Sequence, residues 1–302
     1  MNSLDMSVNI AGVKWKNPIT TASGTFSARE SGEFYDLSEL GALTTKGVSY
    51  EEWEGNATPR IAETYGGMLN SIGLQNKGVE HFIKEELPVL KRYGVPIIVN
   101  VVGKTVEEYC RVVERLSETD IDMIELNISC PNIKEGGISF GTDPKMAFSL
   151  VERVRKSTRK ALIVKLSPNV TDITQIARSV EAAGADCLSL INTLLGMRID
   201  VHKRKPVLAN RVGGLSGPAI KPVALRMVYE VRRSVDLPII GIGGIMTGED
   251  AVEFLMAGAN AVAVGTASLV DPTAPFRIKN ELKQFMLEYN YRSIKEIELL
   301  EE

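Results

Sequence analysis

Short apolar runs recur along the chain and are mostly separated by stretches with helical periodicity. Several runs, such as 96–100 and 161–165, are almost continuously apolar, a pattern typical of strands covered on both faces. Alternation of strands and helices favours a parallel sheet. The pattern predicts strands near 18–23, 42–48, 96–102, 123–129, 161–167, 187–192, 238–243 and 261–265.

A short repeat supports this organisation. Residues 181–186 (EAAGAD) and 255–260 (LMAGAN) each lead into a β-rich run, and 40–43 (LGAL) does the same. In each, a glycine ends a helix and a small residue starts the next strand. Eight such units predict an α/β fold, a (β/α)8 TIM barrel that forms one domain over residues 1–302. An open doubly wound sheet is the alternative, although no GxGxxG motif follows the first strand.

Three segments lie outside the repeat. Residues 8–15 alternate around Ala11-Gly12 and predict an N-terminal hairpin that closes the bottom of the barrel. The segments 49–74 and 194–218 are longer than barrel loops need to be, and such loops are usually functional. Both follow strands, so we expect them over the C-terminal face, where barrel active sites form.

Composition limits the possible partners and location. The chain has 302 residues, a net charge of −3 and three scattered cysteines without a CxxC pair. This predicts no metal site and no disulfide framework, and it fits a reducing, cytoplasmic setting. The near-neutral charge weighs against nucleic acid, and no apolar run or N-terminal signal points to a membrane or to secretion.

Polar residues and glycines follow nearly every predicted strand, at the end where barrel chemistry is built. Lys165, and by the same reasoning Lys46, stands in an apolar run. Because burying an unpaired ammonium group is costly, we expect each lysine to face an anion or an electron-rich group. In chain order, the strand ends carry Ser23 with Gly24, Lys46 with Gly47, Asn100, the residues 127–130, Lys165 with Ser167, Asn192 with Thr193, Gly243 with Gly244, and Gly265 with Thr266.

Glycine-rich turns follow the last two strands, at 241–244 and 265–266. Barrels commonly bind phosphate there through bare backbone amides, and glycine lets the backbone approach the anion. Gly217, in the turn 213–217, lies just upstream. Together with the lysines, these turns fit a mononucleotide-type cofactor such as flavin mononucleotide (FMN), whose reduced ring a lysine can stabilise.

Residues 123–132 (MIELNISCPN) carry the strongest chemical signal. Pro131 cannot extend a strand ladder, so the segment should end in a displayed loop. There the Cys130 thiol, flanked by Asn127 and Asn132, could exchange a proton while the amides hold a polar ligand. A buried structural cysteine is the alternative for Cys130 taken alone.

Several motifs in this order resemble those of the class 1 dihydroorotate dehydrogenases, across essentially the whole chain. The resemblance implies an FMN-containing barrel that oxidises (S)-dihydroorotate to orotate in de novo pyrimidine (UMP) biosynthesis. It rests on 70–76 (NSIGLQN), 127–132 (NISCPN), 165–168 (KLSP), 191–193 (INT), 215–222 (LSGPAIKP) and 241–244 (GIGG).

The resemblance also implies roles for matching residues. Cys130 would be the base that takes the C5 proton, while hydride passes from C6 to FMN. The substrate would be held by Lys46, Asn70, Ser71, Ile72, Gly73, Leu74, Asn127, Asn132, Asn192 and Thr193. One FMN per chain would be bound by Ser23, Lys46, Gly47, Asn100, Asn127, Lys165, Ile191, Gly217, Gly243, Gly244, Gly265 and Thr266.

The subclass follows from the resemblance as well. The membrane-bound, quinone-using class typically has serine as the base and an added N-terminal membrane segment, and neither is expected here. The run 130–143 looks like the catalytic subunit of the NAD-linked, two-subunit class (type 1B). In that class a second protein carries FAD and a [2Fe–2S] cluster and passes electrons to NAD⁺. We expect those cofactors on the partner only, because three scattered cysteines cannot supply the customary four thiolates. The expected assembly is a heterotetramer around a homodimer of this chain.

Other functions remain open on the residues alone. One is another flavin barrel, such as a dihydropyrimidine-type or dihydrouridine reductase. Another is a flavin-free phosphosugar lyase or isomerase that uses Lys165 as a Schiff base. The third is a non-catalytic binding module on the same scaffold.

Overall fold

A computed structural model describes residues 4–129, 131–132 and 138–300 of the chain. Eight parallel strands form one sheet with the order β3-β18-β17-β12-β11-β8-β7-β4, so the predicted (β/α)8 barrel is confirmed. Each predicted strand is present but is shorter than its apolar run. The strands are β3 (Ile19–Thr21), β4 (Leu43–Thr44), β7 (Ile97–Val101), β8 (Met123–Asn127), β11 (Ala161–Lys165), β12 (Cys187–Leu190), β17 (Ile239–Ile242) and β18 (Ala261–Val264).

Threonine hydroxyls help close the barrel between its first two strands. A single parallel bridge joins Thr20 to Ala42. The Thr20 Oγ1 hydroxyl donates to the Ala42 carbonyl at 3.0 Å, and Thr21 Oγ1 donates to the Thr44 carbonyl at 3.0 Å. Gly41 is required at this seam, because a Cβ there would lie 1.9 Å from the Asn17 carbonyl oxygen. Side chains thus replace part of the backbone ladder between β3 and β4.

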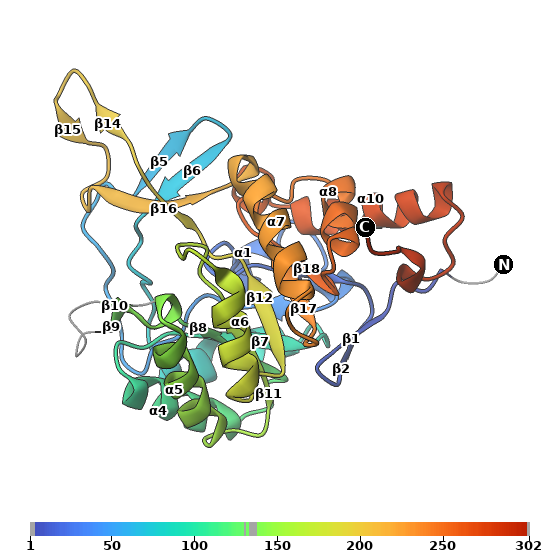
Figure 1. Ribbon diagram of the computed structural model, residues 1–302, viewed down its shortest axis with the longest axis horizontal. Coiled ribbons are helices and arrows are strands. Elements are labelled where there is room, and N and C mark those ends of the chain that lie inside the picture. Colours follow the sequence, from blue (N-terminus) through green and yellow to red (C-terminus); the bar gives the residue numbers. More distant parts are fainter. Residues whose placement is uncertain (1–3, 130, 133–137, 301–302) are drawn as a thin grey trace.

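Amphipathic helices cover the outside of the barrel (Figure 1). In α6, for example, Ile173, Ile176, Ala177 and Val180 are buried at helical spacing. A π-helical turn, η2 (Phe82–Glu86), interrupts the crossover helix between β4 and β7 just before Pro88, which has no N–H to continue the ladder. The α-helices are α1 (Ala28–Ser31), α2 (Val79–His81), α3 (Leu87–Lys91), α4 (Val106–Ser117), α5 (Pro144–Arg155), α6 (Ile173–Ala182), α7 (Lys221–Arg232), α8 (Gly248–Met256), α9 (Ala267–Val270) and α10 (Ala274–Glu288). The short 3₁₀ helices are η1 (Leu37–Glu39), η3 (Phe140–Thr142), η4 (Pro218–Ile220) and η5 (Ile294–Glu296).

The predicted N-terminal hairpin closes the bottom of the barrel. Strands β1 (Val8–Ile10) and β2 (Val13–Trp15) pair antiparallel. Ile10 and Trp15 are fully buried and pack in one cluster with inward-facing residues of six barrel strands, including Met123 and Ile163. The hairpin therefore completes the apolar half of the interior.

The two long insertions form one structure above the barrel. Their strands make an antiparallel sheet in the order β13-β16-β6-β5, which projects from one end of the molecule (Figure 1). The sheet consists of β5 (Ile61–Thr64), β6 (Gly67–Asn70), β13 (Leu194–Met197) and β16 (Val212–Ser216). Two further pairs are β14 (Ile199–Asp200) with β15 (Lys205–Pro206), and β9 (Pro131–Asn132) with β10 (Ile138–Ser139).

Asp250 fixes the turn after β17. It completes a capping box with Thr247, and its Oδ2 atom accepts from the Met246 and Thr247 amides at 2.7 and 2.9 Å. Lys221 Nζ donates to Oδ1 at 2.5 Å. Burial raises the pKa of Asp250, but the hydrogen bonds from Lys221 and the two amides outweigh burial and hold the pKa below its usual 3.8.

Within the described ranges, no helix has both the length and the apolar character needed to cross a membrane. The same residues contain no group of three or more His, Cys, Asp or Glu side chains that could hold a metal ion.

Trp15, in the hairpin that closes the bottom of the barrel, gives a first prediction. Its indole Nε1 is buried and has no hydrogen-bond partner among the described residues. Trp15→Ala should lower the free energy of unfolding by about 3–5 kcal/mol, because it empties the barrel bottom. Trp15→Phe should cost far less, because it keeps an aromatic ring and removes an unsatisfied N–H. Urea denaturation of the two variants tests this, and an equal loss would contradict it.

The Asp250 cap predicts a pH-dependent contribution to stability. Asp250→Asn keeps an acceptor for the amides but loses the ion pair, and should cost about 1–2 kcal/mol at pH 7. Because the folded pKa is depressed, this stabilisation is present above the unfolded value of about 3.8 and is lost as pH falls through the folded pKa. Unfolding curves at pH 7 and at steps down to pH 4 and below should show the difference shrinking only at the acid end.

Candidate active site

A cavity of about 540 Å³ lies at the C-terminal ends of the barrel strands, beneath the antiparallel sheet. It brings together all the predicted site residues whose side chains the structure describes, from segments far apart in sequence. Cys130 lies outside the described residues, and for Asn132 the structure describes only its place in β9. The predicted residues that line the cavity are Ser23, Lys46, Gly47, Asn70, Ser71, Ile72, Gly73, Leu74, Asn100, Asn127, Lys165, Ile191, Asn192, Thr193, Gly217, Gly243, Gly244, Gly265 and Thr266.

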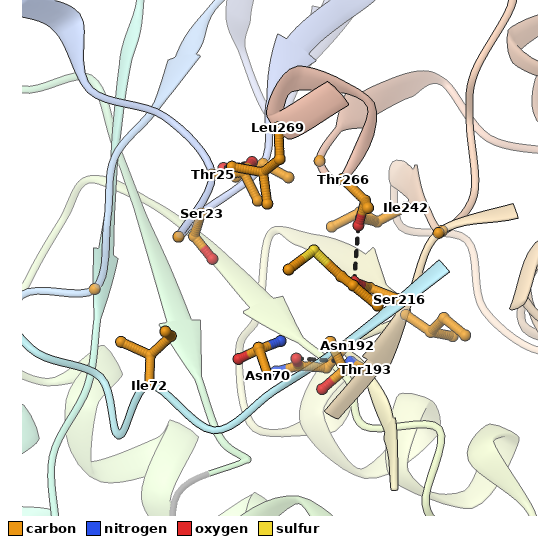
Figure 2. A pocket seen from close by; sticks show the side chains of 18 of the residues that line it. Ser23, Thr25, Asn70, Ile72, Asn192, Thr193, Ser216, Ile242, Thr266 and Leu269 are labelled. Carbon is orange, nitrogen blue, oxygen red and sulfur yellow. Dashed lines mark hydrogen bonds between the residues drawn. The ribbon is translucent and has the colours of Figure 1, made fainter. Parts of the chain in front are cut away.

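Two asparagines at the ends of β8 and β12 hold each other in fixed orientations. Asn192 Nδ2 donates to Asn127 Oδ1 at 3.1 Å and to Ser129 Oγ at 2.9 Å. Asn192 Oδ1 accepts from the Thr193 amide at 2.8 Å, a bond drawn in Figure 2. Asn127 Oδ1 also accepts from the Ser129 amide at 3.3 Å. Among the described residues the Asn127 NH₂ group has no hydrogen-bond acceptor, so it can donate to a ligand.

The segment 70–74 lies across the cavity from Ser23 and Thr266 (Figure 2). Asn56 supports this segment through three hydrogen bonds. Its amide N–H donates to the Ile72 carbonyl at 3.0 Å. Its Nδ2 donates to the Ser71 carbonyl and to the Ser71 hydroxyl, both at 3.1 Å. Asn70 lies at the end of β6, where its Nδ2 donates to the Gly214 carbonyl at 3.4 Å. The segment is therefore a supported binding loop.

Lys165 forms part of a buried polar cluster at the cavity floor. Its side chain is only 6% exposed, and its Nζ donates to Ser23 Oγ at 3.1 Å. The Glu125 carboxylate lies 4.0 Å from that Nζ. Glu125 in turn accepts from Asn100 Nδ2 at 2.6 Å and from Ser189 Oγ at 2.7 Å. The ammonium group therefore has both a hydrogen bond and an anion within reach, as its burial requires.

Lys46 differs from the expectation that both lysines are buried. It is exposed and lies two residues beyond the end of the short strand β4. The burial argument that identified Lys165 therefore does not apply to Lys46. Lys46 still lines the cavity, where its charge can reach an anionic ligand through solvent.

The turns that contain Gly217, Gly243 and Gly244 meet at one wall of the cavity. Gly243 and Gly244 adopt φ values of +136° and +71°, which side chains rarely adopt. A Cβ on Gly244 would lie 2.8 Å from the Gly217 carbonyl oxygen, so these turns pack backbone to backbone. Nearby, Thr266 Oγ1 donates to Ser216 Oγ at 2.8 Å (Figure 2). This wall offers backbone amides and hydroxyls, which suit a phosphate or a chain of hydroxyl groups.

Sequence reasoning missed several residues. Some lining residues, such as Thr25 and Ser216, are neighbours of predicted ones and carry no separate signal. Others, such as Arg60 and Met68, lie in the insertion 49–74, which the sequence indicated only as a functional loop. Glu125 and Ser189 lie below the cavity. The alternation of side chains along a strand could have predicted that they face the barrel interior. Glu125 stands two residues before Asn127, and alternate strand residues point into the barrel together.

Comparisons with known proteins agree with this architecture. The sequence profile described as Dihydroorotate dehydrogenase matches residues 5–286. Three similar proteins, from Alkaliphilus metalliredigens (strain QYMF), Lachnoclostridium phytofermentans (strain ATCC 700394 / DSM 18823 / ISDg) and Geobacter sp. (strain M21), are each described as dihydroorotate dehydrogenase B (NAD(+)), catalytic subunit. They are 60%, 58% and 56% identical to this chain. The matches cover 98%, 94% and 97% of this chain and 99%, 95% and 97% of the three proteins. With its barrel, its cavity and a match of this extent, the chain belongs to the dihydroorotate dehydrogenase family.

Proposed function

We propose that this chain is the catalytic subunit of an NAD-linked dihydroorotate dehydrogenase. It oxidises (S)-dihydroorotate to orotate in de novo pyrimidine (UMP) biosynthesis, as a single FMN-binding domain in the cytoplasm. The observation that carries the proposal is that one cavity at the strand ends gathers paired asparagines, a buried lysine and glycine turns. The relatives named dihydroorotate dehydrogenase B (NAD(+)), catalytic subunit, support the subclass.

The residues of the cavity fit FMN. The glycine wall leaves no room for side chains and suits the ribityl phosphate, while the buried Lys165 suits the electron-rich ring. The Oδ1 atom of Asn100 is buried at the floor without a hydrogen-bond partner among the described residues. When bound, FMN supplies the hydride acceptor. The proposed FMN contacts are the twelve cofactor residues predicted above, all of which line the cavity.

The remaining polar groups fit the substrate. Dihydroorotate presents a carboxylate, carbonyls and ring N–H groups, and asparagine can both donate and accept. The oriented NH₂ group of Asn127 can donate to a carbonyl or carboxylate oxygen, and Lys46 supplies positive charge. The supported segment 70–74 supplies backbone groups on the other side. Asn132 is proposed as a further contact on the basis of its motif alone.

Cys130 is the proposed base. Three residues before it, the Asn127 carbonyl accepts from the Tyr109 hydroxyl at 2.6 Å, and Ser129 Oγ accepts from Asn192, so the chain is held in place up to residue 129. Cys130 would take the C5 proton while hydride leaves C6. A thiol must lose its own proton first, and its reference pKa is about 8.5.

The proposed partners complete the electron path. A second subunit with FAD and a [2Fe–2S] cluster would pass the electrons to NAD⁺, and two copies of this chain would form the core of a heterotetramer. The outer face of the antiparallel sheet supports self-association, because Leu195, Met197 and Val212 expose apolar side chains there. An exposed apolar patch is typical of an interaction surface.

The proposed function predicts a specific pattern of flavin reduction. Purified protein should be yellow, and dihydroorotate should bleach the bound flavin under anaerobic conditions. Stopped-flow absorbance then follows reoxidation by NAD⁺, fumarate and a quinone, each with and without the second subunit. We expect fast reoxidation by NAD⁺ only with the second subunit present. Rapid NAD⁺ use by this chain alone would contradict the subclass, and colourless protein would contradict the flavin.

Cys130 predicts a pH-dependent rate. Turnover should rise with pH through the alkaline range, because more of the thiol is ionised. Cys130→Ser should keep its flavin but lose most turnover at neutral pH, by about 10²-fold or more. Steady-state rates from pH 6 to 10 test this, with Cys110→Ser as a matched control outside the cavity. A flat profile together with an active serine variant would remove Cys130 from the mechanism.

A further inference from the structure

Glu125 is the one carboxylate within 4.0 Å of Lys165 among the described residues. It points into the barrel from the middle of β8, one layer below the cavity, and is 2% exposed. It does not line the cavity, so it acts on a ligand there through its electric field rather than by direct contact. Neither the family resemblance nor the names of the relatives assigns it a role.

Two hydrogen bonds fix the Glu125 carboxylate in place. Asn100 Nδ2 donates to Oε1 at 2.6 Å and Ser189 Oγ donates to Oε2 at 2.7 Å, so each carboxylate oxygen has its own donor. Both donors are themselves fully buried. The two hydrogen bonds therefore keep the Glu125 carboxylate in one orientation, with Oε1 facing the Lys165 ammonium group.

A buried carboxylate is an unusual choice for a structural role. Apolar residues of similar volume usually stabilise an interior as well as a buried ion pair does. The inward-facing layer below it, with Ile98, Met123 and Ile163, is apolar. The Glu125 charge therefore lies at the boundary between the apolar interior and the cavity. It lies beneath Lys165, which the proposed flavin would contact.

Charge near a flavin changes how readily it is reduced. Reduction adds negative charge to the ring, so a nearby cation favours it and a nearby anion opposes it. Lys165 alone would strongly favour the reduced form. Glu125 offsets part of that field, because the two charges lie close together in a site of low dielectric.

We propose that Glu125 is a positioning residue that partly neutralises Lys165 and so sets the reduction potential of the bound flavin. The inference rests on the proposed function, since it requires FMN in the cavity. By holding the potential below the value that Lys165 alone would give, Glu125 makes onward transfer of electrons to the partner subunit more favourable.

The test is the two-electron midpoint potential of the FMN-loaded protein, measured by anaerobic spectroelectrochemistry. Glu125→Gln removes the charge but conserves volume. The glutamine oxygen can still accept from Asn100, and its NH₂ group can donate to the Ser189 hydroxyl. We expect the potential to rise by at least about 30 mV, which is a tenfold change in the equilibrium constant for reduction.

Ser189→Ala is the matched control. It breaks the hydrogen bond to Oε2 but leaves the Glu125 charge in place, so the potential should stay near that of the wild type. A purely structural role predicts similar shifts in both variants. An unchanged or lowered potential in Glu125→Gln would overturn the proposal.

A second comparison covers the case in which Glu125→Gln fails to fold because Lys165 is left without an anion. Lys165→Gln should lower the potential, and the double variant Glu125→Gln/Lys165→Gln should lie above Lys165→Gln by a similar step. Equal potentials in this pair would overturn the inference. If wild-type protein binds no FMN, the proposed function itself is wrong. If FMN binds but its potential does not depend on Glu125, only this inference is wrong.

Discussion

The organisation of the cavity floor depends on the burial of one ammonium group. Lys165 faces inward at the end of β11 and is almost fully removed from solvent. A buried cation needs hydrogen bonds and an anion, and other strands of the barrel supply them. Ser23 comes from the end of β3 and Glu125 from β8, and Glu125 is itself held by side chains from β7 and β12. Five strands of the barrel are thereby joined through one polar cluster.

The residues that stabilise the barrel and the residues that line the cavity occupy different halves of the barrel interior. Its lower interior is apolar and is closed by the N-terminal hairpin, so it needs no polar partners. The upper interior is polar because the strands end there and their side chains can meet a ligand. Glu125 and Asn127 show the change within one strand, where the inward-facing positions run from methionine to glutamate to asparagine.

The two insertions close the cavity from above by pairing with each other. Residues 61–70 and 194–216 are far apart in the chain, yet β6 and β16 lie side by side in one sheet. The pairing places the segment 70–74 opposite the barrel strands and keeps Gly217 beside Gly244. The residues proposed to hold the substrate and those proposed to hold FMN thus line one cavity, although they come from different parts of the chain.

The sequence by itself determined the barrel, its hairpin and most of the polar and glycine positions that line the cavity. The reason is that continuous apolar runs define buried parallel strands, and the polar residue after each run must lie at the same end of the barrel. It did not determine which of two similar lysines is buried, because Lys46 follows a strand of two residues and Lys165 ends one of five. Nor did it reveal that the two insertions form one sheet, or that Glu125 lies beside Lys165. Those contacts depend on the register between neighbouring strands, which only the closed tertiary structure decides.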